Sequence, residues 1–308
     1  MKPIIPMFYF PLKTLFVDDD IELLKAYHHL QLPNKIATEN NPLKAIDELI
    51  KNTKQTIGIF NDISDENIID SFETNEAVLS FTFKNIKKLI NDNEKYERYG
   101  IIVTDYNMPI LNGIELCNRI NDLDIIKILL TGEYNPLCAI PKLNNNTIDY
   151  FLQKGQINSS QLLDSINLLQ LKYFKNITQN FFNVTNNKFN FLANPDFATL
   201  IKKLISENYI TEYYLLNHTG CFLMANNHSK FILNIYSDND LNVFNDMYSQ
   251  DINQDILNKV NKRELIPHFE LPYSKNYSQY FYPCIKSGQH YYNFSKLTNK
   301  NIFQGKNS

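Results

Sequence analysis

Glycine is scarce in this sequence: eight occur among 308 residues, and none belongs to a Gly-rich loop of the kind that cradles phosphate groups. Long hydrophobic runs are missing as well, since no stretch approaches the roughly 18 consecutive apolar residues that could span a bilayer. With a net charge of −3, the chain as a whole has no excess of basic residues that would bind nucleic acid non-specifically. These absences argue against an integral membrane protein and against a protein that binds nucleic acid through its overall charge.

The cysteines and the first residues indicate a reducing compartment. The four cysteines stand far apart, which fits buried thiols better than a disulfide framework or a zinc site. The opening 12 residues lack the apolar stretch and small-residue cleavage site of a secretory signal. We therefore expect a cytoplasmic protein. With 44% hydrophobic residues the chain can bury a large core, and its length favours two domains.

The first half of the chain alternates apolar runs with segments of helical periodicity. Strand-like runs occupy residues 14–17, 35–38, 100–105, 125–131 and 149–154. Apolar residues at helical spacing occupy residues 21–30, 42–50, 112–120 and 160–178. Such an alternation, with near-continuous apolar strands, predicts an α/β fold: a doubly wound parallel sheet of five strands covered by helices on both faces.

Side chains with carboxylate, hydroxyl or amine groups end these predicted strands or directly follow them. They are Asp18 and Asp19, Asp105, Thr131 and Lys154. Because the carboxyl ends of parallel strands share one edge of a sheet, we expect these side chains to converge there. Clustered carboxylates repel one another, and a hard cation such as Mg²⁺ relieves that repulsion. The Asp105 carboxylate could then attack phosphorus, with a lysine charge and a threonine hydroxyl facing the phosphoryl oxygens.

Four segments in this order resemble the receiver domain of bacterial two-component response regulators, a CheY-like family. The segments are Leu15–Asp20, Asp105–Leu116, Leu129–Gly132 and Phe151–Lys154. The resemblance covers about residues 13–178 and implies a flavodoxin-like receiver fold. It also implies that Asp105 accepts a phosphoryl group from a sensor histidine kinase or a phosphotransfer protein, which would be the partner of this chain.

The resemblance assigns roles to the other residues of these segments. Mg²⁺, the implied cofactor, would be held by Asp18, Asp19, Asp105 and the backbone carbonyl of Asn107. Thr131 and Phe151 would form the switch, in which the threonine moves toward the phosphoryl group and the aromatic ring turns inward. Lys154 would pair with the phosphoryl group, and no cofactor other than the metal is implied.

Three features depart from the family pattern. Gly155 follows the lysine where the family places proline, and Pro136 and Pro141 interrupt the region of the fourth helix at 135–146. An excess of chain lies at about residues 53–98. We interpret this excess as an ordered helical insert packed beside the sheet, which could serve as a dimer or partner surface. Its strand-like part is Ile57–Phe60, and its helix faces carry Ile68, Ile69, Phe72, Val78, Phe81, Phe83, Ile86, Leu89 and Ile90.

The predicted domains are an N-terminal arm at 1–12, a receiver domain at 13–178 and an α+β output domain at 179–308. In the output domain the pattern predicts helices at 195–207, 240–249 and 252–265. It predicts strands at 212–216, 221–225 and 231–236, and a hairpin that joins 280–286 to 289–295. The sequence shows no helix-turn-helix pattern with a basic recognition helix.

These observations predict a response regulator that signals through altered self-association, for example as a homodimer, or through partner binding. No enzymatic activity is expected beyond phosphoryl transfer to Asp105. Three alternatives remain: the output domain is an enzyme that acts on a nucleotide or small ligand, it binds nucleic acid or a nucleotide-like ligand, or the receiver is degenerate and acts only as an interaction module. From Asn180 onward the chain carries 12 basic and 10 acidic residues, a near balance that disfavours nucleic acid.

Overall fold

The computed structural model describes residues 5–30, 35–52, 75–132, 147–156, 158–184, 189–268 and 280–297. The chain divides into two compact units. One unit is Phe10–Ser71 with Lys88–Ile177, and the other combines Met1–Tyr9, Phe72–Lys87 and Thr178–Ser308. Among the described residues no helix is long and apolar enough to cross a membrane.

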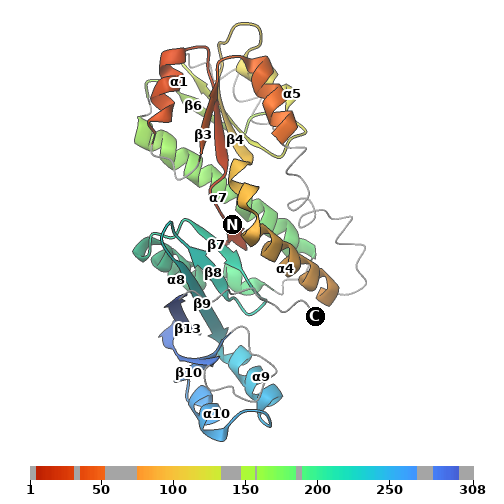
Figure 1. Cartoon of the computed structure of the whole chain (residues 1–308), viewed down its shortest axis with the longest axis vertical. Coiled ribbons are helices and arrows are strands. Elements are labelled where there is room, and N and C mark those ends of the chain that lie inside the picture. The colour runs from red at the N-terminus through yellow and green to blue at the C-terminus, as the bar shows by residue number, and fades with distance from the viewer. Residues whose placement is uncertain are drawn as a thin grey trace. The chain divides into compact units, whose positions relative to one another are not determined.

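The unit that holds Asp105 is built on a five-stranded sheet in the order β3-β2-β4-β5-β6, with every neighbouring pair parallel (Figure 1). Its strands are β2 (Lys13–Val17), β3 (Ile36–Glu39), β4 (Tyr99–Asp105), β5 (Ile126–Thr131) and β6 (Tyr150–Gln153). Its helices are α1 (Ile21–His28), residues 42–52, α5 (Gly113–Arg119) and most of α7 (Ser159–Val184). The predicted fold class is confirmed, and the strands differ from the predicted runs by one or two residues.

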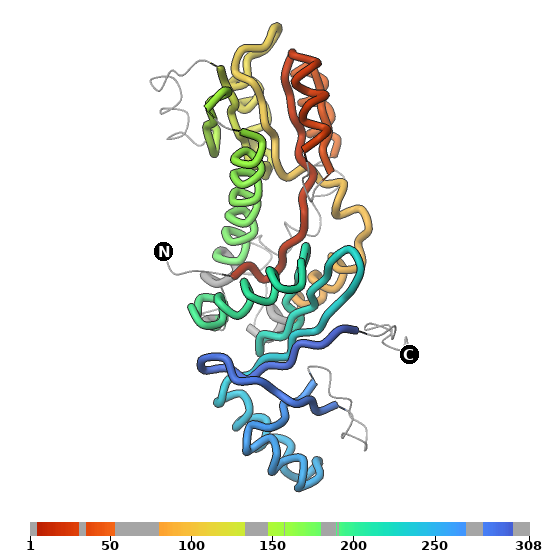
Figure 2. Tube along the Cα trace, turned by 90° about the vertical axis from the view of Figure 1, so that its left-hand side faces the viewer, coloured from red at the N-terminus to blue at the C-terminus, as the bar shows by residue number. Residues whose placement is uncertain are grey.

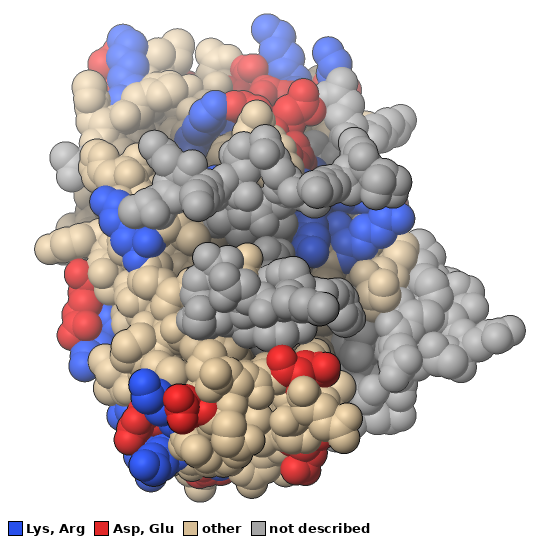
Figure 3. All heavy atoms as spheres, turned by 60° about the horizontal axis from the view of Figure 1, so that its bottom comes forward, with Lys and Arg blue, Asp and Glu red and all other residues tan. Residues whose placement is uncertain are grey.

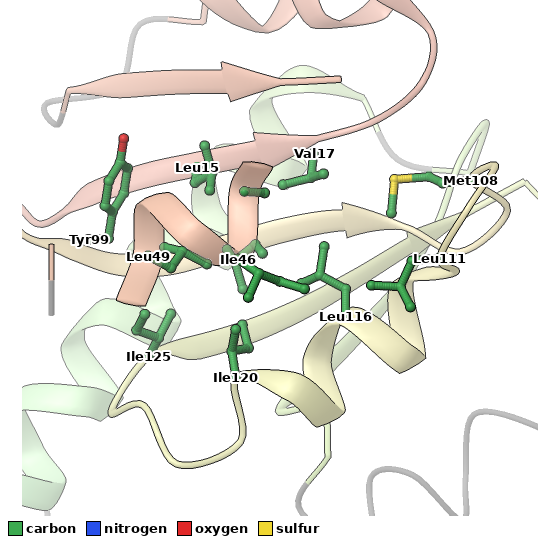
Figure 4. Packing of buried hydrophobic residues seen from close by; sticks show 12 residues of the cluster. Leu15, Val17, Ile46, Leu49, Tyr99, Met108, Leu111, Leu116, Ile120 and Ile125 are labelled. Atoms are coloured by element: carbon green, nitrogen blue, oxygen red, sulfur yellow. The ribbon is translucent and has the colours of Figure 1, made fainter. Parts of the chain in front are cut away.

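Two apolar clusters cover the two faces of this sheet. Leu15 and Val17 of β2 pack with residues of the helical segment 42–52 and of α5, as Figure 4 shows. Phe16 of the same strand packs with residues of α1 and α7. Successive strand side chains point to opposite faces, so a continuous apolar run is the pattern that a sheet covered on both faces requires.

The second unit contains a six-stranded antiparallel sheet in the order β1-β7-β8-β9-β13-β12 and a two-stranded sheet of β10 and β11 (Figure 2). Its strands are β1 (Phe8–Tyr9), β7 (Glu212–Leu215), β8 (Phe222–Ala225), β9 (Lys230–Ser237), β10 (Leu265–Pro267), β11 (Phe281–Pro283), β12 (Ile285–Ser287) and β13 (His290–Lys296). Its helices include α8 (Pro195–Glu207), α9 (Asp238–Tyr248) and α10 (Gln254–Asn261). The predicted α+β architecture is confirmed.

Two details of this unit differ from the sequence prediction. The predicted strand 280–286 is two strands, because β11 pairs with β10 while β12 pairs with β13. The helix predicted over 252–265 ends at Asn261. Arg263 adopts a left-handed backbone with φ of 60°, and its guanidinium Nε donates a 2.7 Å hydrogen bond to Asp238, so the chain leaves the helix there.

Two residues of the N-terminal arm form a strand of the antiparallel sheet. Phe8 pairs with Tyr214 and Tyr9 with Tyr213, so β1 forms one edge of that sheet. The backbone N–H of Leu215 donates a 2.6 Å hydrogen bond to the carbonyl of Met7. The side chains of Met7 and Phe8 are 0% and 1% exposed. A strand of two residues has no periodicity, so the sequence pattern could not identify it.

The excess of chain at 53–98 is partly described. Residues 53–74, which include the predicted strand-like stretch 57–60, lie outside the described residues. The region of the fourth helix at 135–146 also lies outside them. Helix α4 (Asn75–Asn91) is followed by a 3-10 turn at Asn93–Glu97, which agrees with the expected helical character. Its residues up to Lys87 group with the antiparallel sheet, where the sequence had predicted packing beside the parallel sheet. Within the unit of the antiparallel sheet, the ring centroids of Phe83 and Phe189 lie 6.2 Å apart.

Candidate functional site

Three carboxylates meet at the carboxyl end of the parallel sheet. Asp18 and Asp19 follow β2, and Asp105 is the last residue of the neighbouring β4. One carboxylate oxygen from each lies within 4.8 Å of the other two. Asp18 and Asp105 are 2% and 6% exposed, whereas Asp19 is exposed to solvent. Adjacent strands that end at the same level therefore bring Asp105 to the consecutive acids Asp18 and Asp19, which lie far from it in the sequence.

Lys154 joins two of these acids. Its Nζ lies 2.7 Å from Oδ2 of Asp18 and 2.7 Å from Oδ1 of Asp105. The residue follows β6, which lies beyond β5 from the acids, and the long lysine side chain spans that distance. The backbone N–H of Lys154 donates a 2.7 Å hydrogen bond to the carbonyl of Thr131, which fixes the chain at this point.

Each paired acid has a second hydrogen bond from the backbone. Oδ1 of Asp18 accepts the N–H of Asp20 at 3.0 Å, and Oδ2 of Asp105 accepts the N–H of Asn107 at 2.9 Å. One oxygen of each carboxylate is thus held by the backbone and the other by Lys154. Two donors per carboxylate fix its orientation as well as its position.

Burial and pairing shift two pKa values in this cluster. Burial raises the pKa of Asp18 above its usual value, although hydrogen bonds from Lys154 and the backbone of Asp20 act in the opposite direction. For Lys154, burial by itself lowers the pKa. The hydrogen bonds to Asp105 and Asp18 outweigh burial, so the pKa of Lys154 is raised and the amine stays charged.

The loop after β4 depends on a glycine. Helix α5 begins with a capping box, in which the Asn112 side chain accepts the N–H of Glu115 and the Glu115 carboxylate accepts the N–H of Asn112. A Cβ on Gly113 would lie 2.1 Å from the carbonyl oxygen of Asp105. Only glycine lets this helix start so close to the strand that carries Asp105.

The other three predicted site residues are Thr131, Phe151 and Asn107. Thr131 ends β5 and is 2% exposed, and Phe151 of β6 packs against a small buried cluster that includes Leu129. Asn107 is exposed and contacts Asp105 through its backbone N–H. The roles predicted for Thr131, for Phe151 and for the Asn107 carbonyl remain predictions.

The donor set fits a hard divalent cation. Asp18, Asp19 and Asp105 offer oxygen ligands only, the type that Mg²⁺ prefers. Three ionised carboxylates and one ammonium group leave two negative charges in excess, which one divalent cation neutralises. The chemistry of these residues thus agrees with the predicted metal.

Gly155, where the family has proline, adopts φ of 80°. Proline is locked near φ of about −65° and cannot take this conformation. The backbone conformation of the loop therefore explains why this position holds glycine and not proline. A Cβ at Gly155 would meet no atom within 4 Å, so conformation rather than space makes glycine the suitable residue.

A cavity of about 210 Å³ lies beside Lys154, and the sequence analysis did not identify it. Its lining combines apolar side chains with the loop after β6: Leu23, Tyr27, Leu30, Leu130, Lys154, Gly155, Asn158, Ser159 and Leu162. The Tyr27 ring stacks on Phe16 at 4.3 Å. Burial is the main cause that raises the pKa of Tyr27, and the nearby carboxylates of the acidic cluster raise it further. No local sequence signal distinguishes this tyrosine from an ordinary core residue of an amphipathic helix.

Comparisons with solved structures include a match that covers nearly the whole chain. The chain is similar to the Legionella pneumophila response regulator LqsR, with 25% sequence identity and a TM-score of 0.74, over 98% of this chain and 93% of that chain. It also matches a receiver domain of a putative Luxo repressor protein from Vibrio parahaemolyticus, with 18% identity and a TM-score of 0.36, over 55% of this chain and 96% of that chain. No protein-family model and no curated protein sequence match this chain.

Proposed function

Because this chain consists of a CheY-like receiver domain of the response-regulator family and an additional domain, we propose that it is a phosphorelay regulator phosphorylated on Asp105. The proposed donor is a phosphohistidine on a sensor histidine kinase or a phosphotransfer protein. The observation that carries the proposal is the pairing of Lys154 with both Asp18 and Asp105 inside a cluster of three acids. Cytoplasmic location is part of the same proposal.

The proposed reaction is an in-line transfer. A carboxylate oxygen of Asp105 attacks phosphorus, the bond between phosphorus and the donor histidine nitrogen breaks, and an acyl phosphate forms. The Lys154 ammonium group pairs with the phosphoryl oxygens, and the Thr131 hydroxyl donates to one of them. Asp18, Asp19, Asp105 and the Asn107 carbonyl are the proposed holders of Mg²⁺, which when bound neutralises charge on the phosphoryl oxygens.

The proposed signal is a change of packing that follows the added charge. The phosphoryl group carries about −1.5 to −2 charges in place of the single charge of the free carboxylate, and its oxygens draw the Thr131 hydroxyl toward them, which lets Phe151 turn inward. The division that we propose assigns residues 13–178 to the receiver and 179–308 to the output domain, whose sheet is completed by Phe8–Tyr9. The output is altered self-association, such as homodimer formation, or altered binding of a partner protein.

Nucleic-acid binding by the output domain is the second candidate. Among the described residues on the face in Figure 3, basic and acidic side chains stand in small groups among uncharged ones. A protein that grips phosphate backbones presents a continuous basic surface, so this mixture disfavours the candidate. DNA binding that weakens steeply with added salt would favour it instead.

The test is intact-mass measurement after incubation with acetyl phosphate and Mg²⁺. The wild-type chain is expected to gain the mass of one phosphoryl group, and Asp105→Asn is expected to gain none. Asp164→Asn is the matched control, because Asp164 is an exposed aspartate on α7. A wild-type chain without the gain, or an equal gain in the Asp105→Asn variant, would contradict the proposal and favour a degenerate receiver. Sedimentation of the phosphorylated and unphosphorylated chains then tests the change of self-association.

A further inference from the structure

The connection between β2 and α1 is only three residues long, and two of these residues are proposed ligands. β2 ends at Val17 and α1 begins at Ile21, so Asp18, Asp19 and Asp20 form the whole connection. Asp20 is the N-cap of α1, with an extended backbone at φ −80° and ψ 99°. Its Oδ1 accepts the N–H groups of Glu22 at 2.9 Å and Leu23 at 3.1 Å.

The same residue also supports the Asp18 carboxylate. The N–H of Asp20 donates to Oδ1 of Asp18 at 3.0 Å, so the residue that caps α1 also contacts a proposed ligand. On the other side, the N–H of Asp18 donates to the carbonyl of Glu39 at 3.3 Å. The backbone of Asp19 is therefore held between a strand end and a helix cap.

We propose that Asp20 is a positioning residue for the cation site formed by Asp18, Asp19 and Asp105. Its cap oxygen fixes the backbone from which the first two ligands project, so that cation affinity depends on that oxygen. This inference rests on the proposed function of the site and deepens it. A site whose ligands are held in place before binding loses less entropy when the ion binds.

A competing explanation is the charge of Asp20, which would attract a cation without any cap. The Asp20 side chain is exposed, and solvent and salt screen an exposed charge. The two explanations separate in one pair of variants. Asp20→Asn keeps an equally good cap oxygen and removes the charge, whereas Asp20→Ala removes both.

The experiment is a calorimetric Mg²⁺ titration of the full chain. Loss of an N-cap corresponds to roughly a three- to tenfold change in an equilibrium constant, so Asp20→Ala is expected to bind Mg²⁺ about three- to tenfold more weakly. Asp20→Asn is expected to stay within about twofold of wild type. A second readout is amide hydrogen exchange at Glu22 and Leu23, which should become faster in the alanine variant only.

The matched control removes a cap in the other unit. Asn253 caps α10 through a 2.7 Å hydrogen bond from the N–H of Asp255, and Asn253→Ala should lower stability without changing Mg²⁺ affinity. If wild type and Asp20→Ala bind Mg²⁺ with equal affinity, the inference is overturned while the proposed site stands. The same holds if Asp20→Asn and Asp20→Ala lose equal Mg²⁺ affinity. Absence of Mg²⁺ binding by the wild-type chain overturns the proposed site and the inference with it.

Discussion

The ammonium nitrogen of Lys154 lies 2.7 Å from a carboxylate oxygen of Asp105, although Asp105 ends β4 and Lys154 follows β6, which is not a neighbour of β4 in the sheet. The same nitrogen is equally close to Asp18. Both acids are almost fully buried, and a buried carboxylate without a partner is costly. This lysine therefore stabilises the folded receiver in addition to its proposed role in phosphoryl transfer.

We expect Lys154→Met to lower the free energy of unfolding by about 3 kcal/mol at neutral pH, because removing one partner leaves buried charges uncompensated. Added Mg²⁺ should restore part of the loss by linkage. Urea denaturation with and without Mg²⁺ measures both effects. Lys203→Met is the control, since its pair with Glu207 is exposed and 3.9 Å long, and it should cost less than about 1 kcal/mol. Equal losses in the two variants would contradict the prediction.

As the solution is acidified, the affinity for Mg²⁺ should begin to fall at a higher pH than an ordinary aspartate ligand would allow. A proton and the cation compete for the Asp18 carboxylate, and burial raises the pKa of that group. A raised pKa means that more of Asp18 is protonated at any given pH, so affinity begins to fall at a higher pH than for an ordinary aspartate. Calorimetric titrations at a series of pH values test this. Affinity that stays constant down to about pH 4, near the ordinary aspartate pKa, would refute it.

Gly113→Ala should destabilise the receiver by about 2 kcal/mol, because the new methyl group would overlap the carbonyl of Asp105 and force α5 away from β4. The variant should also accept phosphate from acetyl phosphate more slowly. Gly132→Ala is the control for stability, since a Cβ there meets no atom within 4 Å. The clash argument fails if both variants unfold at the same urea concentration.

Gly155→Pro should destabilise the protein even though it restores the residue that the family usually has. The φ of 80° at this position is inaccessible to proline, so the loop that carries Lys154 must rearrange. Gly155→Ala should cost about 1 kcal/mol, and Gly155→Asn should cost less, because asparagine tolerates left-handed backbone. Thermal unfolding of the three variants measures this order. A proline variant as stable as wild type would show that the loop has a different conformation.

Phe8→Ala should lower stability by about 3 kcal/mol, because the ring is 1% exposed in the unit of the antiparallel sheet. Amide hydrogen exchange should become faster in β7, the strand that pairs with Phe8–Tyr9. Met247→Ala, at a side chain that is 68% exposed, is the control and should change stability little. Unchanged exchange in β7 would mean that this sheet does not need its N-terminal strand.

Much of the receiver could be predicted because its signals are local. Apolar runs that stop at Asp18 and Asp105 indicate strands that end in polar loops, and alternation with helices then determines a parallel sheet. The helix start at Ile21 also has a local signal in Asp20, an aspartate directly before helical periodicity. Its effect on the neighbouring ligands has no such signal, because it depends on the hydrogen bond from the Asp20 N–H to Asp18.

The sequence by itself determined the two fold classes, the order of most of their elements and the edge of the parallel sheet at which the acids gather. Periodicity and strand ends are properties of short stretches of chain, and each stretch carries its own pattern. Only the tertiary structure decided that Phe8 and Tyr9 complete a sheet formed far along the chain, and that α4 up to Lys87 belongs with that sheet. It also decided that Gly155 takes a left-handed backbone. Such features depend on contacts between distant segments or on the path that packing imposes on a loop, and no local pattern of residues encodes either.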